Sequence, residues 1–303
     1  MTSLKIKRAL LGAKNQDGLV MKLIMYLALV GMGFVFLYPL LYMIAISFMS
    51  LGDLVNHAIV WLPTSFYLGN YEHAIQVMGF ARTLGETLIV SATPSVLQTL
   101  AAAFIGYGLA RFDFRGKRLI LVLVLLTFVV PPQVLLIPRH ILFNQLGFIH
   151  NIRAYLWPAV TGQGLNSTIF ILIFYQTFRT LPKSLEEAAQ LDGSGHFGIF
   201  ARIALPLAVP AMIVSLLFSF VWYWNETFMA AFYLGDSFTT LPLELARFIA
   251  LFNQMHSGDN DININEGIEM AGTFLTILPL LVIFFVCQRW FVEGVDKSGI
   301  TGE

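Results

Sequence analysis

Long runs of apolar residues alternate with shorter polar segments along this chain. A helix needs roughly 20 consecutive apolar residues to cross the hydrocarbon core of a membrane, which is about 30 Å thick. Six runs approach that length, at residues 23–48, 86–110, 119–143, 166–180 (extending back to about 154 if its polar start is included), 207–233 and 268–292. The pattern therefore predicts an all-α membrane protein with six transmembrane helices and both termini on one side.

The distribution of Lys and Arg predicts which side that is. Cytoplasmic loops of membrane proteins carry an excess of these residues. Fourteen of them fall on the face that holds both termini, and four fall on the opposite face: Arg82, Arg139, Arg153 and Arg247. We therefore expect cytoplasmic N- and C-termini, and a cytoplasmic loop between the fourth and fifth runs.

The composition agrees with a membrane protein and excludes some classes of function. The chain has 303 residues, of which 57% are hydrophobic and 12% charged, and its mean hydropathy is +0.75; soluble domains are about 25% charged. The formal net charge is zero, so no basic field favours nucleic acid as a partner. Cys287 is the one cysteine in the sequence, so we expect neither a disulfide framework nor a cysteine metal cluster.

Prolines interrupt several of the apolar runs. They lie at Pro39, Pro94, Pro131, Pro132, Pro138 and Pro279. Broken helices at membrane depth are tolerated where the freed backbone is buried in protein or lines a cavity, although a proline kink also serves helix packing alone. Their number favours a transport pathway over a simple anchor.

Motifs of catalysis and nucleotide binding are missing from the sequence. It contains no GxxxxGK[ST] phosphate loop, no HExxH and no GxSxG, and we find no constellation of nucleophile, base or metal ligands. We therefore expect a protein that is not an enzyme, that binds no cofactor or metal of its own and that has no ATPase site.

A carboxylate within the fifth run is the clearest candidate for the transport pathway. Glu226 lies in "WYWNETF", and charge inside the hydrocarbon is expensive unless it has a function. Its neighbours Trp224, Asn225 and Phe228 combine aromatic faces with an amide, which suits a hydroxyl-rich ligand such as a sugar. An interhelical polar clamp without ligand contact is the competing interpretation.

The loop between the fourth and fifth runs, residues 182–206, has the pattern of two short helices. Pro182 suits a first helical turn, and Gly193 and Gly195 permit a sharp turn. The first helix has small side chains at Ala188 and Ala189, which would let another protein's backbone approach closely. The second helix presents Phe197, Phe200 and Ile203. This pattern favours a surface on which another protein docks over a bare connector.

The same loop resembles a known motif. "EAAQLDGSGHFGIFARIALPLAVP", Glu187 to Pro210, is similar to the EAA motif of the permease subunits of ATP-binding cassette (ABC) importers. The segments "YPLLYMIAISF", "LGNYEHAI", "GYGLARFDFRGKRL" and "FVVPPQVLLIPRHILFNQLGF" resemble the carbohydrate-type, MalG-like branch of that family. The resemblance covers residues 23 to 299.

The resemblance implies a type I ABC importer permease fold and a division of labour among subunits. A cytoplasmic segment 1–22 would precede a permease domain 23–292, and a cytoplasmic tail 293–303 would follow it in a multi-pass protein of the prokaryotic inner membrane. Its partners would be a second permease subunit, two ATP-binding subunits that carry ATP and Mg, and an external solute-binding protein. The loop would couple to the ATPase through Glu187, Ala188, Ala189, Asp192, Gly193, Phe197, Phe200, Leu205 and Pro206.

The function implied is the ATP-driven import of a carbohydrate, with the chain forming half of the translocation pathway. Disaccharides, longer oligosaccharides, polyols and glycerol-phosphate compounds are handled by permeases of this kind. The substrate pathway would include Trp224, Asn225, Glu226 and Phe228. A secondary transporter that uses an intramembrane carboxylate, Glu226, for proton coupling is the alternative.

Overall fold

A computed structural model describes residues 12–13, 16–257 and 263–297 of the chain. The predicted segment 1–22 and tail 293–303 lie partly outside these residues, and so do Lys5, Lys7, Arg8 and Lys14 of the charge count. The chain divides into two compact units, Met1–Ala74 with Gly258–Phe274 and Ile75–Ser257 with Leu275–Glu303. We describe each unit by itself.

The described residues are overwhelmingly helical, as the apolar pattern predicts. A two-residue hairpin, β1 (Gly12–Ala13) with β2 (Gln16–Asp17), precedes the helices. The helices are α2 (Leu19–Ser47), α3 (Leu51–Val55), α4 (Gly69–Val77), α5 (Phe80–Arg111), α6 (Lys117–Val129), η1 (Pro132–Leu135), α7 (Leu136–Gln145), α8 (Arg153–Val160), α9 (Ser167–Thr180), α10 (Lys183–Leu191), α11 (His196–Ile199), η2 (Phe200–Ala204), α12 (Leu205–Leu207), α13 (Val209–Asn225), η3 (Ala230–Leu234), α14 (Leu241–Ala246), α15 (Phe248–Met255) and α16 (Glu266–Lys297).

The first unit is built on the C-terminal end of α2. A capping box between Ser50 and Asp53 begins α3, since each side chain bonds the other's backbone N–H. The buried Asn70 amide donates to the carbonyl oxygens of Ser47 and Met49, at 3.0 and 2.8 Å. These bonds satisfy the orphan carbonyls where α2 ends.

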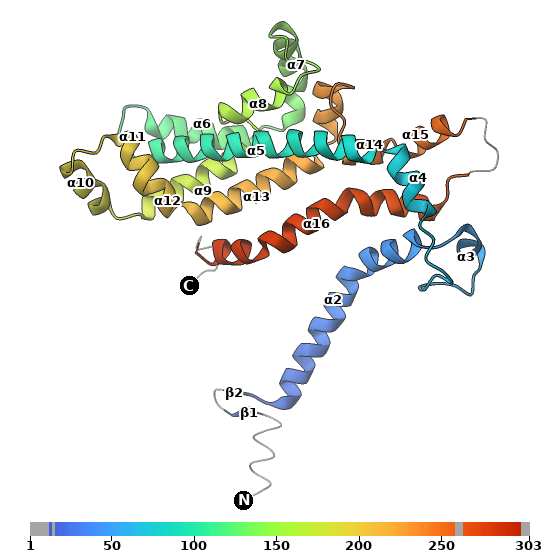
Figure 1. Cartoon of the computed structure of the whole chain (residues 1–303). Helices are drawn as coiled ribbons and strands as arrows, with labels where there is room; N and C mark the ends of the chain where they lie inside the picture. The colour runs from blue at the N-terminus through green and yellow to red at the C-terminus, as the bar shows by residue number, and fades with distance from the viewer. Residues whose placement is uncertain (1–11, 14–15, 258–262, 298–303) are drawn as a thin grey trace, which may run out of the picture. The chain divides into compact units, whose positions relative to one another are not determined.

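The second unit is a bundle in which α5 packs along α9 and α13 (Figure 1). Small and polar side chains line the packed face of α5, and Gly106 brings it close to α9. A methyl group at Gly106 would lie 2.6 Å from Cβ of Phe174 and 2.9 Å from the backbone nitrogen of Tyr175. Small residues allow this close backbone approach in membrane bundles. Next to Gly106 along α5, Tyr107 packs with Phe178 and Phe200 in an aromatic part of the buried core.

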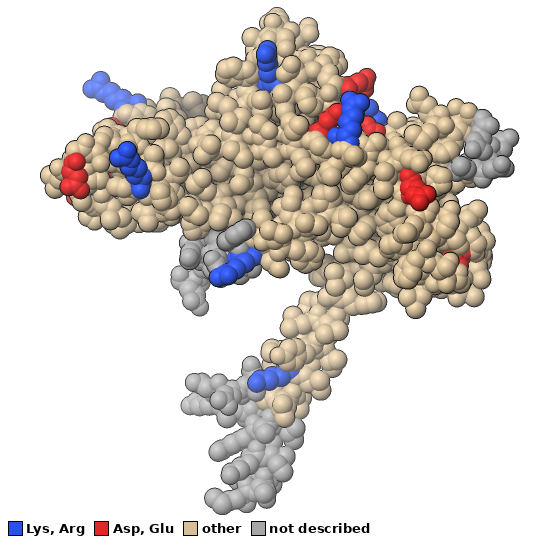
Figure 2. Space-filling view, in the orientation of Figure 1, with Lys and Arg blue, Asp and Glu red and all other residues tan. Residues whose placement is uncertain are grey.

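Among the residues that the structure describes, three helices are long and apolar enough to cross a membrane: Leu19–Ser47, Phe80–Arg111 and Glu266–Arg289. Two further pairs of helices are long enough only when both members of a pair are counted together across a bend. The bend is 97° between α6 and the η1–α7 segment, and 78° between α11–α12 and α13. The predicted fourth span is α9, whose 14 residues extend about 21 Å, short of the hydrocarbon core. Few charged side chains appear on the face shown in Figure 2.

The prolines explain the bend in the predicted third span. Val130 precedes Pro131 and has an extended backbone, with ψ of 118°, because the proline ring disfavours the helical conformation of the preceding residue. The helix therefore ends at Val129, and a 3₁₀ turn starts the chain in a new direction at Pro132. The prolines were expected to interrupt the run 119–143, and the structure divides it at Val130 into α6 and the η1–α7 segment.

Candidate functional site

The loop of residues 182–206, which the sequence predicts to be a cytoplasmic docking element, begins with two short helices, α10 and α11. Pro182 lies one residue before the first turn of α10, at its N-cap, instead of inside it. At the other end Gly193 adopts a left-handed conformation with φ of 80°. Its N–H donates to the Gln190 carbonyl and the Ser194 N–H donates to the Ala189 carbonyl, at 3.0 and 2.9 Å. This pair of bonds is the Schellman motif, which stops a helix and reverses the chain.

The faces of α10 differ in what they contact. Glu187, Ala188 and Asp192 are exposed, and Ala189 is buried against the rest of the second unit. Leu191 next to them is 90% exposed. The predicted coupling residues of α10 therefore divide into an outward face, available to a partner, and an inward face that holds the loop in place.

A buried ion pair holds the inward face, and the sequence prediction missed it. Arg111 at the end of α5 places its Nε 2.8 Å from Oε1 of Glu186, and these side chains are only 5% and 16% exposed. The same guanidinium donates to the carbonyl oxygen of Leu181, at 2.8 Å. Arg111 thus ties the start of α10 to the membrane helix α5, which lies between α10 and α14 in Figure 1.

The second helix of the loop corrects one prediction. Phe197 and Phe200 were expected to form one docking face, but Phe197 is 73% exposed and Phe200 is 8% exposed. The two rings are neighbours, with centroids 6.4 Å apart, but Phe200, where the chain changes from α-helix to π-helix, is buried in the aromatic core and Phe197 is not. Phe200 packs on Tyr107 and Phe104. Of the residues that follow, Leu205 is partly buried and Pro206 is exposed.

The predicted pathway residues also separate. α13 ends at Asn225, so Glu226 does not lie in the middle of a helix as expected. Its Oε1 accepts a hydrogen bond from the Met229 N–H at 2.8 Å, which caps the next turn in the manner of an N-cap residue. Trp224 is 1% exposed and packs on Phe220 within the protein. Glu226 was expected in the middle of the fifth span, and that prediction is wrong, because the helix ends just before Glu226.

Glu226 and Phe228 line a cavity of about 550 Å³, whereas Trp224 and Asn225 are not among its lining residues. The cavity lies between α6, α7 and the N-terminal end of α9. Its polar lining side chains include Thr127, Gln133, Arg139, Gln163, Asn166, Thr168 and Glu226. A second cavity of about 580 Å³ is lined mainly by apolar groups of α7, α8 and the segment between them, among them Trp157 on α8 and Phe148 in that segment.

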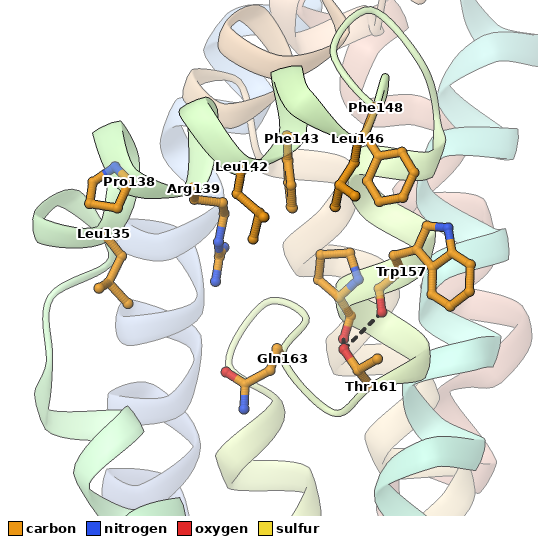
Figure 3. A pocket seen from close by; sticks show the side chains of 11 residues that line it. Leu135, Pro138, Arg139, Leu142, Phe143, Leu146, Phe148, Trp157, Thr161 and Gln163 are labelled. Atoms are coloured by element: carbon orange, nitrogen blue, oxygen red, sulfur yellow. Dashed lines mark hydrogen bonds between the residues drawn. The ribbon is translucent and has the colours of Figure 1, made fainter.

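Arg139 and Gln163 line both cavities. Figure 3 shows Arg139 extending from α7 toward the space beside Gln163, while Trp157 on α8 lies at the opposite side of the pocket, next to Phe148. Sequence reasoning missed Arg139 because it was counted as one of the basic residues outside the membrane. The signal was present, since Arg139 falls within the predicted third span and follows Pro138.

A buried hydrogen-bond network fixes the turn that carries Gln163. Gln98 on α5 donates through Nε2 to the Leu165 carbonyl at 2.7 Å and accepts from the Tyr223 hydroxyl at 2.8 Å. The Leu165 N–H donates to the same hydroxyl at 3.3 Å. Such satisfied networks hold a unique geometry, so the polar side of the cavity is built on rigid elements.

Comparison with known proteins gives a consistent result. Residues 98–297 match the family described as "Binding-protein-dependent transport system inner membrane component". The osmoprotective compounds uptake permease protein GgtD of Synechocystis sp. is 32% identical over 285 residues, 92% of each chain. The alpha-glucoside transport system permease protein AglG of Rhizobium meliloti is 34% identical over 79% of this chain and 62% of its own.

A solved structure shares the fold. It is a bacterial ABC transporter involved in the import of the acidic polysaccharide alginate, and one of its chains superposes with a TM-score of 0.72 at 20% identity, over 90% of this chain and 96% of that one.

Proposed function

We propose a function from the premise that this chain belongs to the family of binding-protein-dependent transport system inner membrane components. In our proposal it is the permease subunit of an ATP-driven importer for a carbohydrate and forms half of the translocation pathway. Relatives named for the transport of alpha-glucosides and arabinooligosaccharides support the substrate class. The observation that carries the proposal is the capped helical loop of residues 182–206 with its exposed Glu187 and Ala188.

The proposed arrangement in the membrane has six spans with cytoplasmic termini. Five come from the three long helices and the two bent pairs. The sixth would combine α9 with α8, which precedes it across the turn at 161–166. The cytoplasmic side would then carry α10 and, at the cytoplasmic end of the fifth span before its 78° bend, α11. The excess of Lys and Arg there supports the orientation.

The proposed assembly has a second permease subunit, two ATP-hydrolysing subunits and an external solute-binding protein in the prokaryotic inner membrane. The ATPase subunits would hold ATP and Mg. When they close on ATP, the docked α10 would move with them and carry α5 through Arg111. Transport requires two global states that the nucleotide biases through a differential contact, and the docked loop supplies that contact.

The outward face of the loop is tested by substitution in the complete transporter. Glu187→Lys reverses an exposed charge, and Gly193→Trp places a large side chain on a residue with φ of 80°. We expect both variants to insert in the membrane but to lose the ATPase subunits on co-purification and at least about tenfold of ATP-dependent uptake. Ser184→Ala, an exposed change on the same helix, is the control and should leave both unchanged.

Two results would contradict the proposal. One is full ATPase retention and full uptake by both loop variants. The other is uptake by vesicles that lack ATP but have a proton gradient, with its loss in Glu226→Gln, which is the behaviour of a secondary transporter.

A further inference from the structure

Arg139 lies beside the cavity without a counter-ion among the described residues. It lies on α7, after the 97° bend, and is only partly exposed. Within residues 16–257 and 263–289 no carboxylate oxygen lies within 4.0 Å of its guanidinium. A guanidinium carries five N–H donors in a fixed planar fork. A guanidinium that lines a cavity without a counter-ion is available to hydrogen-bond acceptors of a molecule from outside the chain.

Glu226 provides the complementary acceptor in the same cavity. Its Oε1 caps Met229, and among the hydrogen bonds of the described residues none ends on its Oε2. The cavity therefore has a donor fork on α7 and a free carboxylate oxygen at the end of α13. Their charges offset each other, so the electrostatic preference is for a neutral ligand with both donor and acceptor groups.

The adjoining cavity provides an apolar surface beside the same arginine. The rings of Trp157 and Phe148 stack with centroids 6.2 Å apart and an 8° angle between their planes, and Trp157 remains 53% exposed. Each cavity lies within the range of about 300–1,000 Å³ that is typical of small-molecule sites. A flat aromatic surface next to hydrogen-bonding groups suits a pyranose ring, which has apolar faces and hydroxyls at its edge.

From these observations we propose that Arg139 is the polar centre of a binding site for a neutral saccharide within this chain. The ring hydroxyls accept from the Arg139 fork and exchange hydrogen bonds with Gln163 and Glu226, and one sugar face lies toward Trp157. An acidic saccharide pairs with Arg139 but is repelled by Glu226, so it binds less well. The proposal rests on the proposed function and specifies its substrate class and recognition residues.

The test is uptake by the complete transporter in cells and in proteoliposomes, with a panel of neutral disaccharides and with digalacturonate as an acidic probe. The wild type should transport a neutral member of the panel in preference to digalacturonate. Arg139→Gln keeps a polar side chain but loses the charged fork and should raise KM for the neutral solute about tenfold or more. Arg139→Lys keeps the charge without the fork and should give an intermediate KM.

Two controls separate recognition from folding. Arg153→Gln removes an exposed arginine on neighbouring α8 and should leave KM unchanged. Gln163→Ala should raise KM in the same direction as Arg139→Gln by a smaller factor, since a neutral hydrogen bond is weaker than a charged one. Co-purification of the ATPase subunits shows that each variant still assembles.

The outcomes separate the two proposals. If the wild-type complex imports a neutral saccharide with ATP and assembled Arg139→Gln keeps the wild-type KM, the binding site is wrong and the transport function stands. Selective uptake of digalacturonate that Arg139→Gln abolishes would overturn the neutral class. A wild type without ATP-dependent uptake would overturn the transport function itself.

Discussion

Arg111 and Arg139 lie in the same unit of the chain, and each has a glutamate in its neighbourhood. In the fold, Arg111 and its glutamate form an ion pair, which we call the closed pair. Arg139 and its glutamate do not, and we call them the open pair. Arg111 and Glu186 approach to 2.8 Å and are shielded from solvent, whereas Arg139 and Glu226 share a cavity of about 550 Å³ without an ion pair. A closed pair fixes two elements to each other. An open pair offers a donor and an acceptor to a third molecule.

Breaking the closed pair should have the largest effect on stability. Glu186→Ala leaves the Arg111 guanidinium buried without its counter-charge, which costs about 3 kcal/mol of unfolding free energy. Thermal unfolding of the purified transporter measures the loss. Lys117→Ala is the control, because it removes a partner of Asp113, a side chain that is 94% exposed, and should leave the unfolding midpoint unchanged.

The double variant Arg111→Glu with Glu186→Arg sharpens this prediction. If the pair acts as an ion pair, the exchange should recover a substantial part of the stability that either single charge reversal loses. Equal losses in the double and single variants would mean that the shapes of these side chains matter and their charges do not.

Packing of α5 on α9 should have the next largest effect. A Cβ at Gly106 would meet Phe174 and the backbone of Tyr175 at 2.6 and 2.9 Å, so Gly106→Ala should destabilise by about 2 kcal/mol through overpacking. Gly108→Ala is the matched control two residues away, where an added Cβ has no neighbour within 4 Å. It should be neutral or stabilising, because alanine favours the helix. Similar midpoints for the two variants would contradict the close contact.

The carboxyl group of Glu244 tests the effect of partial burial, and its expected contribution to stability is smaller. Glu244 on α14 is half-buried, and burial raises its pKa above the ordinary value, an effect that Arg247 partly opposes. The folded state therefore holds this proton more tightly than the unfolded state. The stabilisation is present below the unfolded pKa of roughly 4.3 and is lost as the pH rises through the folded pKa.

Glu244→Gln should remove this part of the pH dependence. The unfolding midpoint of the variant should change less between about pH 4 and pH 7 than that of the wild type. Glu72→Gln, at an exposed carboxylate, should follow the wild type. A variant with the full pH dependence would show that other groups cause it.

Local sequence signals predicted the helix and the turn in the loop of residues 182–206. Pro182 at the N-cap and Gly193 in the left-handed conformation act on their immediate neighbours, so their effects are readable in the sequence. The same approach failed at Phe200, because the burial of that side chain depends on packing against Tyr107 and Phe178 from other helices.

Charge was harder to interpret than helix boundaries. The rule that intramembrane charge marks a functional site pointed to Glu226. It was not applied to Arg139, which falls within the predicted third span but was counted on the external face. The end of the helix just before Glu226 was also missed, since the apolar run continues past this residue to residue 233. Hydropathy averages over a window and does not detect a single residue that leaves the helix.

The sequence by itself determined the class of protein, the set of apolar helices and the capped loop that resembles a coupling element. Those features depend on hydropathy, on proline and glycine and on short motifs, all of which act over a few residues. Only the tertiary structure joined Arg111 to Glu186 and placed Arg139, Gln163 and Glu226 around one cavity. These residues are 24 to 87 positions apart and come together only when helices pack, and that packing is a property of the whole bundle.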